Sequence, residues 1–254
     1  MLTAFVGTNS LRGSQGIYTL AIDEHTAEMK IVRTIPAENS SYLCIDKDEK
    51  HLYATIESNS FHGIDGGGVS AYQIDEDGNL TFINEQPTYG KLPCYVDVES
   101  DYLYVSNYGE GTLVCYPLEQ DGSIGGCERK ISHLPSAQKV PHVHCSEITP
   151  DGEYICVLDC GIDAVAFYNA KGEHRYDLVQ TSHGYTLMAW EPHRNEWYSA
   201  EIQKTPEDLR NALLGTYANF LEDKITGNDR DLTVTETGEI QQRCRELWEK
   251  CRET

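Results

Sequence analysis

The sequence predicts a mostly β protein: an incomplete β-propeller of about four blades, followed by a C-terminal helical hairpin. Short alternating apolar runs, interrupted by Gly, Asp and Asn, fill the chain up to about residue 174. A pattern of paired strands recurs there about every 50 residues. The last third of the chain instead carries two stretches with helical periodicity.

The repeat appears as three copies of one strand pair. Leu52, Leu103 and Ile155 occupy corresponding places, at steps of 51 and 52 residues. Each copy leads into a second strand pair, and Asp-Gly turns join alternating runs in the first two copies. Four short antiparallel strands per repeat are typical of a propeller blade, whereas the alternative, a β-sandwich, would not repeat so regularly. We expect one partial blade, two full blades and a fourth over about 142–172, with 177–180 as its candidate outer strand.

Composition argues against several classes of partner. The 254 residues carry a net charge of −21, which is unfavourable for binding nucleic acid or an anionic membrane surface. No apolar stretch reaches the roughly 18 residues that a spanning helix needs. The first residues have no basic segment followed by an apolar one, so they do not resemble a signal peptide. We expect a cytoplasmic protein with neither a nucleic-acid nor a membrane partner.

The nine cysteines do not form the paired spacings of a zinc site. Cys156 and Cys160 would lie on one face of a strand, where a metal could use them. Small buried thiols in a reducing compartment are the favoured alternative. We expect no metal and no cofactor.

The C-terminal part is expected to hold two helices. Thr205 followed by Pro206 and two acids is a typical helix start, and an apolar stripe follows it. A second helix is expected from near Thr237 to the end. The predicted division is therefore 1–180 for the blades and 181–254 for a linker with two helices. These helices could cap an open blade edge, or they could derive from a fusion or frameshift.

Several motifs of the first 174 residues resemble the lactonase family of seven-bladed β-propellers, which includes 6-phosphogluconolactonases and muconate-lactonizing enzymes. The most specific is Pro141-His142-Val143-His144, preceded by Gln138-Lys139. Ser106-Asn107-Tyr108 with Gly111 resembles an Asn-Tyr-x-x-Gly segment of the family. The family's Arg before the glutamine is Ala137 here, and later-blade Glu and Arg residues have no counterpart.

The resemblance implies a carbohydrate lactone hydrolase of the 6-phosphogluconolactonase type with an incomplete site. Histidine suits general acid–base work near neutral pH, and His142 and His144 would face one side of a strand. We expect these two residues to be catalytic, one as proton acceptor or donor and the other orienting the substrate. The candidate substrate-binding residues are Glu57, Asn107, Gln138, Lys139 and Asp159.

The histidines and the residues at strand ends also have a purely structural interpretation. The two histidines could line a loop, and Asn107 and Asp159 could serve strand-end turns. The alternative function is a non-catalytic propeller scaffold that binds a protein or a small ligand. The expected partner is a small lactone, and open blade edges could also allow self-association.

Overall fold

A computed structural model describes the chain except residues 11–12, 134–138, 150–151, 153, 170–173, 182–183, 192–195, 200–203, 228–229 and 254. The chain divides into two compact units, Met1–Asp177 and Leu178–Thr254. In the described part of the chain, no helix is both long enough and apolar enough to cross a membrane.

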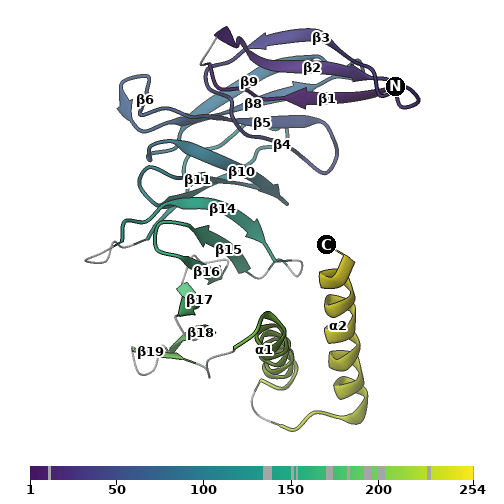
Figure 1. The fold of residues 1–254 in the computed structure, drawn as a ribbon, viewed down its shortest axis with the longest axis vertical. Helices are drawn as coiled ribbons and strands as arrows, with labels where there is room; N and C mark the ends of the chain where they lie inside the picture. Colours follow the sequence, from purple (N-terminus) through teal and green to yellow (C-terminus); the bar gives the residue numbers. More distant parts are fainter. Residues whose placement is uncertain are drawn as a thin grey trace. The chain divides into compact units, whose positions relative to one another are not determined.

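Unit 1 consists of successive antiparallel sheets, which we call blades 1 to 4 (Figure 1). Blade 1 is three-stranded and contains β1 (Leu2–Val6), β2 (Gly16–Ile22) and β3 (Met29–Pro36). Blade 2 contains β4 (Leu43–Ile45), β5 (His51–Ile56), β8 (Gly68–Ile74) and β9 (Leu80–Pro87), with a small hairpin of β6 (Ser60–Phe61) and β7 (Ile64–Asp65). Blade 3 contains β10 (Pro93–Glu99), β11 (Tyr102–Asn107), β12 (Thr112–Pro117) and β13 (Arg129–Ser132). Blade 4 contains β14 (Val143–Ile148), β15 (Tyr154–Asp159), β16 (Ala164–Asn169) and β17 (His174–Thr181), of which the residues up to Asp177 belong to unit 1. The described sheets do not close into a ring.

The predicted mostly β, propeller-type fold is confirmed. Leu52, Leu103 and Ile155 each lie at the second position of the second strand of a blade. In Figure 1 the sheets follow one another in chain order, from purple β1–β3 to green β14–β16. A strand, β17, includes the residues 177–180 that were predicted as the last strand of the fourth blade.

Alternating side chains bury both faces of the inner blades. On β12, Leu113 and Cys115 pack toward blade 4, whereas Val114 and Tyr116 pack toward blade 2. Each fully buried apolar side chain of this size contributes about 1.5–3 kcal/mol to folding. The core is therefore a series of layers, one between each pair of neighbouring blades.

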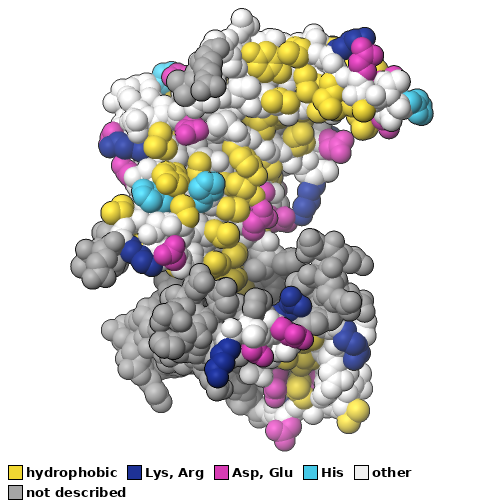
Figure 2. All heavy atoms as spheres, viewed as in Figure 1, with side chains coloured by type: hydrophobic (Ala, Val, Ile, Leu, Met, Phe, Trp, Pro, Cys, Tyr) yellow, Lys and Arg dark blue, Asp and Glu magenta, His cyan; other side chains and the backbone are white. Residues whose placement is uncertain are grey.

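The outer strand of blade 1 is covered less well. Met29, Ile31 and Val32 of β3 are 62 %, 63 % and 49 % exposed. Figure 2 shows hydrophobic side chains over the region that β1–β3 occupy in Figure 1. Among the described sheets, blade 1 packs against blade 2 alone, so its other face keeps apolar side chains exposed.

Unit 2 contains β18 (Gly184–Glu191), β19 (Glu196–Ser199), α1 (Pro206–Thr226) and α2 (Val234–Glu253). The predicted start of α1 is confirmed, since the Thr205 hydroxyl accepts a hydrogen bond from the N–H of Asp208 at 3.1 Å. The two helices pack on each other, with Leu221 and Ile240 buried.

Two expectations for this unit differ from the structure. The stretch expected to be a linker contains the antiparallel pair β18–β19, because its alternating apolar residues suit a strand better than a connection. The second helix begins at Val234 rather than near Thr237. Thr233 caps it: its N–H donates to Glu236 Oε2 at 2.8 Å and its hydroxyl accepts from the N–H of Glu236 at 3.3 Å.

Candidate functional site

Within blades 2 to 4, five connections meet at one set of strand ends, because adjacent strands in each blade run antiparallel. They are 57–67, 88–92, 108–111, 133–142 and 160–163, and we call this surface the histidine face. Backbone hydrogen bonds join neighbouring connections, such as Tyr108 N–H to Leu92 O at 3.0 Å and Cys160 N–H to His142 O at 3.1 Å. The described parts of these loops therefore form one continuous framework.

Both predicted catalytic histidines contact the ring of Tyr108 on this face. The His142 ring stacks on Tyr108 with centroids 4.3 Å apart and planes inclined by 9°. The His144 ring meets Tyr108 edge-on, with centroids 5.8 Å apart and an angle of 88°. The structure thus brings together the two histidines that the sequence singled out, and it adds Tyr108, which the Asn-Tyr-x-x-Gly segment already contained.

The ring of His142 is oriented by a hydrogen bond to the backbone. Its Nδ1 lies 2.8 Å from the carbonyl oxygen of Tyr108, and a carbonyl oxygen can only accept. Nδ1 therefore carries a hydrogen, and in the neutral ring the lone pair is on Nε2. Within the described residues Nε2 has no hydrogen-bond partner, which leaves it free to accept a proton.

The two histidines lie together for a reason other than plain strand alternation. His142 precedes β14, and the pairing of β14 with β15 is interrupted between Val143 and Cys145, so that His144 is the bulged residue. His142 is half-buried and His144 is exposed. The bulge presents the ring of His144 to solvent, while Tyr108 holds that of His142.

Asp159 lies at the end of β15, and its carboxylate accepts four hydrogen bonds. Oδ1 accepts from the backbone N–H groups of His142 at 2.7 Å, Gly161 at 2.9 Å and Ile162 at 3.2 Å. Oδ2 lies 2.7 Å from Nδ1 of His133. Burial of Asp159 opposes its ionisation, but the hydrogen bonds from His133 and from the N–H of His142 outweigh it, and the pKa of the carboxyl is lowered.

His133 is a residue that the sequence analysis missed. Its side chain is 3 % exposed, and its ring packs on Tyr168 with centroids 5.8 Å apart. Its Nδ1 faces the Asp159 carboxylate, whereas its Nε2 is buried without a hydrogen-bond partner among the described residues. No short motif marks it; the only signal is its place directly after the last strand of a blade.

Asn107 is buried in the layer between blades 2 and 3. Its amide nitrogen donates to the carbonyl oxygen of Thr88 at 3.1 Å and to the hydroxyl of Thr112 at 3.0 Å. The side chain packs against Gly90, where an added Cβ would lie 2.5 Å from the amide nitrogen. The residue fastens the 88–92 connection to blade 3.

The other predicted substrate-binding residues lie around the histidines. Glu57 is half-buried near Cys94, whose thiol donates to the carbonyl oxygen of His144 at 3.6 Å. Lys139 pairs with Asp163 at 2.9 Å, which ties its loop to the 160–163 connection. Gln138 lies outside the described residues.

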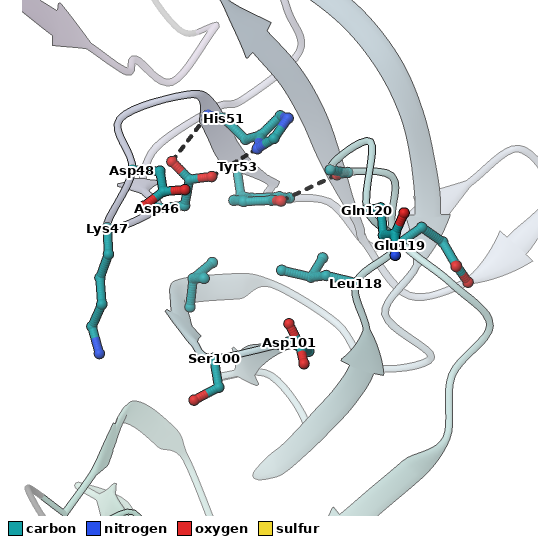
Figure 3. A pocket seen from close by; sticks show the side chains of 12 residues that line it. Asp46, Lys47, Asp48, His51, Tyr53, Ser100, Asp101, Leu118, Glu119 and Gln120 are labelled. Carbon is teal, nitrogen blue, oxygen red and sulfur yellow. Dashed lines mark hydrogen bonds and ion pairs between the residues drawn. The ribbon is translucent and has the colours of Figure 1, made fainter.

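A separate groove lies at the opposite strand ends (Figure 3). It has a volume of about 540 Å³. Its lining includes four carboxylates, those of Asp46, Asp48, Asp101 and Glu119. Lys47, at its rim, pairs with Glu99 at 2.7 Å. The groove shares no residue with the group formed by Tyr108, His142 and His144, which we call the histidine cluster. The candidate site is therefore identified by its chemistry rather than by the size of a cavity.

Known proteins resemble this chain over most of unit 1 and part of unit 2. The family described as "Lactonase, 7-bladed beta-propeller" matches residues 3–187. A 6-phosphogluconolactonase of Bacillus subtilis is 33 % identical over 178 residues, which are 66 % of this chain and 49 % of the relative. A Staphylococcus aureus (strain USA300) protein is 28 % identical over 250 residues, covering 93 % of this chain and 69 % of the relative.

Solved structures share the fold of this chain. A Bacteroides fragilis crystal structure has a TM-score of 0.62 at 25 % identity and covers 81 % of this chain and 68 % of that one. The periplasmic gluconolactonase of Pseudomonas aeruginosa shares the fold, with a TM-score of 0.62 at 24 % identity over 78 % of this chain and 67 % of that one. The chain spans about half the length of two of the curated relatives that it matches. The chain belongs to the lactonase family of seven-bladed β-propellers.

Proposed function

We propose that the histidine cluster of this chain opens the ring of a sugar lactone by hydrolysis. The observation that carries the proposal is the arrangement of His142, with Nδ1–H held by the Tyr108 carbonyl and Nε2 unpartnered among the described residues. Family membership supports the same reaction, since a relative of 33 % identity is named as a 6-phosphogluconolactonase.

In this proposal Nε2 of His142 acts first as general base. It takes a proton from a water molecule while the water oxygen attacks the lactone carbonyl carbon, giving a tetrahedral intermediate. The intermediate collapses with cleavage of the bond between the carbonyl carbon and the ring oxygen. The protonated His142 then returns its proton to the departing ring oxygen, and the product is an open hydroxy acid.

His144 has the second role, that of orienting the substrate. Its ring is exposed beside the same tyrosine, so it can donate to a lactone oxygen that lies over His142. Glu57 and Lys139 remain candidate contacts for substrate hydroxyl groups at the edge of the cluster. Comparing turnover of a phosphorylated with that of an unphosphorylated lactone identifies which of the two the chain prefers.

The full chain is incubated with δ-gluconolactone and, separately, with 6-phosphogluconolactone, and the acid released is titrated at constant pH. We expect a rate above that of buffer for at least one lactone. His142→Gln should lower this rate by about 10²–10⁴-fold, because a general base contributes that much. His144→Gln should mainly raise KM, because the imidazole would be lost from binding rather than from proton transfer.

A folded, monodisperse chain without turnover on either lactone would contradict the proposal. That result would favour the scaffold alternative, in which this surface binds a ligand without converting it. The expected self-association through open strand edges also stays a prediction, and sedimentation equilibrium over a range of concentrations measures it.

We further propose that the chain works in the cytoplasm. The eight described cysteines are free thiols, as is usual in a reducing compartment. Fractionation of cells that produce the chain checks this, and recovery in a secreted or periplasmic fraction would contradict it.

A further inference from the structure

The junction between blades 3 and 4 has a counterpart between blades 2 and 3. Thr88 and His133 each follow the last strand of a blade, and their N–H groups donate to corresponding carbonyls, of Gly67 at 2.9 Å and of Gly111 at 3.0 Å. Asn107 and Asp159 each end the second strand of the next blade. In both junctions the side chain at the strand end forms a hydrogen bond to the residue that follows the preceding blade.

The chemistry of these two hydrogen bonds differs. At the earlier junction a neutral amide, that of Asn107, donates to the backbone carbonyl of Thr88. At the later junction the carboxylate of Asp159 faces an imidazole, that of His133. The amide suffices to join two blades, so blade packing by itself does not require the ionisable pair at the later junction.

The carboxylate of Asp159 also makes hydrogen bonds to backbone groups that have no counterpart at the amide of Asn107. Asp159 Oδ1 binds the N–H of His142 at 2.7 Å, whereas the equivalent N–H, that of Leu92, donates to the carbonyl of Ser58 at 3.0 Å. Through Gly161 and Ile162 the same oxygen also holds the 160–163 connection. A single buried atom thus fixes the backbone of the proposed base.

His133 completes this arrangement by occupying the second carboxylate oxygen. The side chains of His133 and Asp159 are 3 % and 0 % exposed, so solvent does not compete for this bond. The imidazole donates Nδ1–H to Oδ2 and leaves Oδ1 to the three backbone groups. Stacking on Tyr168 sets the plane of the ring.

We propose that Asp159 and His133 are a positioning pair, which holds His142 in register with Tyr108 and so keeps Nε2 of His142 directed at the reacting water. Neither residue touches the substrate. The catalytic meaning of the pair rests on the proposed lactone hydrolysis, but its effect on the His142 ring does not.

The test compares Asp159→Ala with Asn107→Ala in the full chain, two truncations at equivalent places of the repeat. The readout is the ¹⁵N and ¹³C spectrum of the histidine rings, with His142 assigned through His142→Gln. The wild type should show His142 as the Nδ1–H tautomer. Asp159→Ala should move and broaden the His142 signals far more than Asn107→Ala, because Asn107 makes no hydrogen bond to His142.

Kinetics give a second readout. Asp159→Ala should lower kcat for lactone hydrolysis by about ten- to a hundredfold with little change in KM, as expected for misplacement of a base. Asp159→Asn keeps an oxygen for the N–H of His142 and should fall between wild type and Asp159→Ala in both readouts. His133→Ala should shift the His142 signals in the same direction as Asp159→Ala.

Unchanged His142 signals in Asp159→Ala would overturn the proposal. Should Asp159→Ala not fold, the isosteric Asp159→Asn decides by the same spectra. A wild type that is inactive on lactones but whose His142 signals move in Asp159→Ala would refute the proposed function and leave the positioning pair standing.

Discussion

The junction of blades 2 and 3 and the junction of blades 3 and 4 share a backbone but not a chemistry. Both contain a bulge in the first strand of the later blade, centred on Cys94 in one and on His144 in the other. The residue two places earlier is Leu92 in the first junction and His142 in the second. The repeat therefore supplies a frame, and the side chains at a few corresponding places give one junction a proton-transfer group that the other lacks.

The largest expected difference between the two junctions is in how much their side-chain hydrogen bonds contribute to the free energy of unfolding. Asp159→Ala leaves the buried His133 and three partly buried backbone N–H groups without their acceptor, and losing one partner of a buried pair costs about 3–5 kcal/mol. Asn107→Ala loses one amide and should cost about 1–3 kcal/mol. Urea unfolding followed by circular dichroism measures both, and equal losses would contradict the distinction.

Two corresponding glycines sharpen the comparison. A Cβ on Gly161 would lie 2.0 Å from the carbonyl oxygen of Val140 and 2.7 Å from the nitrogen of His142. A Cβ on Gly109 would lie less close, at 2.8 Å from Lys91 Cβ and 2.9 Å from the Lys91 carbonyl oxygen. Overpacking costs about 1–3 kcal/mol, and we expect Gly161→Ala to lie at the upper end of that range and Gly109→Ala at the lower.

Gly161→Ala should also reduce turnover, because the displaced backbone carries His142. Gly109→Ala serves as its control and should keep most of the activity. Paired melting curves and steady-state rates check both statements; a larger loss of activity in Gly109→Ala would count against a special role for the later junction.

The carboxylate adds a pH dependence that the amide cannot. The pKa of Asp159 is lowered in the folded chain, so its stabilising effect is present above the unfolded pKa of about 3.9 and is lost as pH falls through the folded value. The difference in unfolding free energy between wild type and Asp159→Asn should therefore shrink below about pH 4. For Asn107→Ala the difference from wild type should stay constant over the same range.

The smallest expected difference between the two junctions is in the reactivity of their thiols, Cys94 and Cys160. Burial first, and the charge of Glu57 next, raise the pKa of Cys94 to about 12, which keeps it an unreactive thiol. Cys160 is exposed, and its Sγ lies 3.5 Å from the carbonyl oxygen of His142. Iodoacetamide should label Cys160 well before Cys94, as peptide mass spectrometry would detect, and the reverse order would show that Cys94 is not protected by its burial.

The repeat predicted the blades because its strands are short, regular and joined by recognisable turns. Leu52, Leu103 and Ile155 mark the second strands correctly, and all three are buried. His142 and His144 could be selected because their spacing is distinctive and resembles that of a known family. These signals are local in the sequence, so no knowledge of packing was needed.

The rest depends on contacts between segments far apart in the chain. His133 and Asp159 are 26 residues apart, and no periodicity relates them. Asp159 was expected to bind substrate, but its side chain is fully buried, where it contacts His133 and the backbone of His142. This burial supports a positioning role instead. The repeat gives a usable rule for this: residues that correspond between junctions, but differ in charge, are candidates for function.

The rate of lactone ring opening by the full chain tests the central claim most directly when His142→Gln is compared with Leu92→Gln, its counterpart at the earlier junction. We predict that His142→Gln loses about 10²–10⁴-fold of the wild-type rate, while Leu92→Gln stays within a few-fold of it. Equal rates for the two variants, or a wild-type rate no higher than that of buffer, would contradict a catalytic role for the later junction.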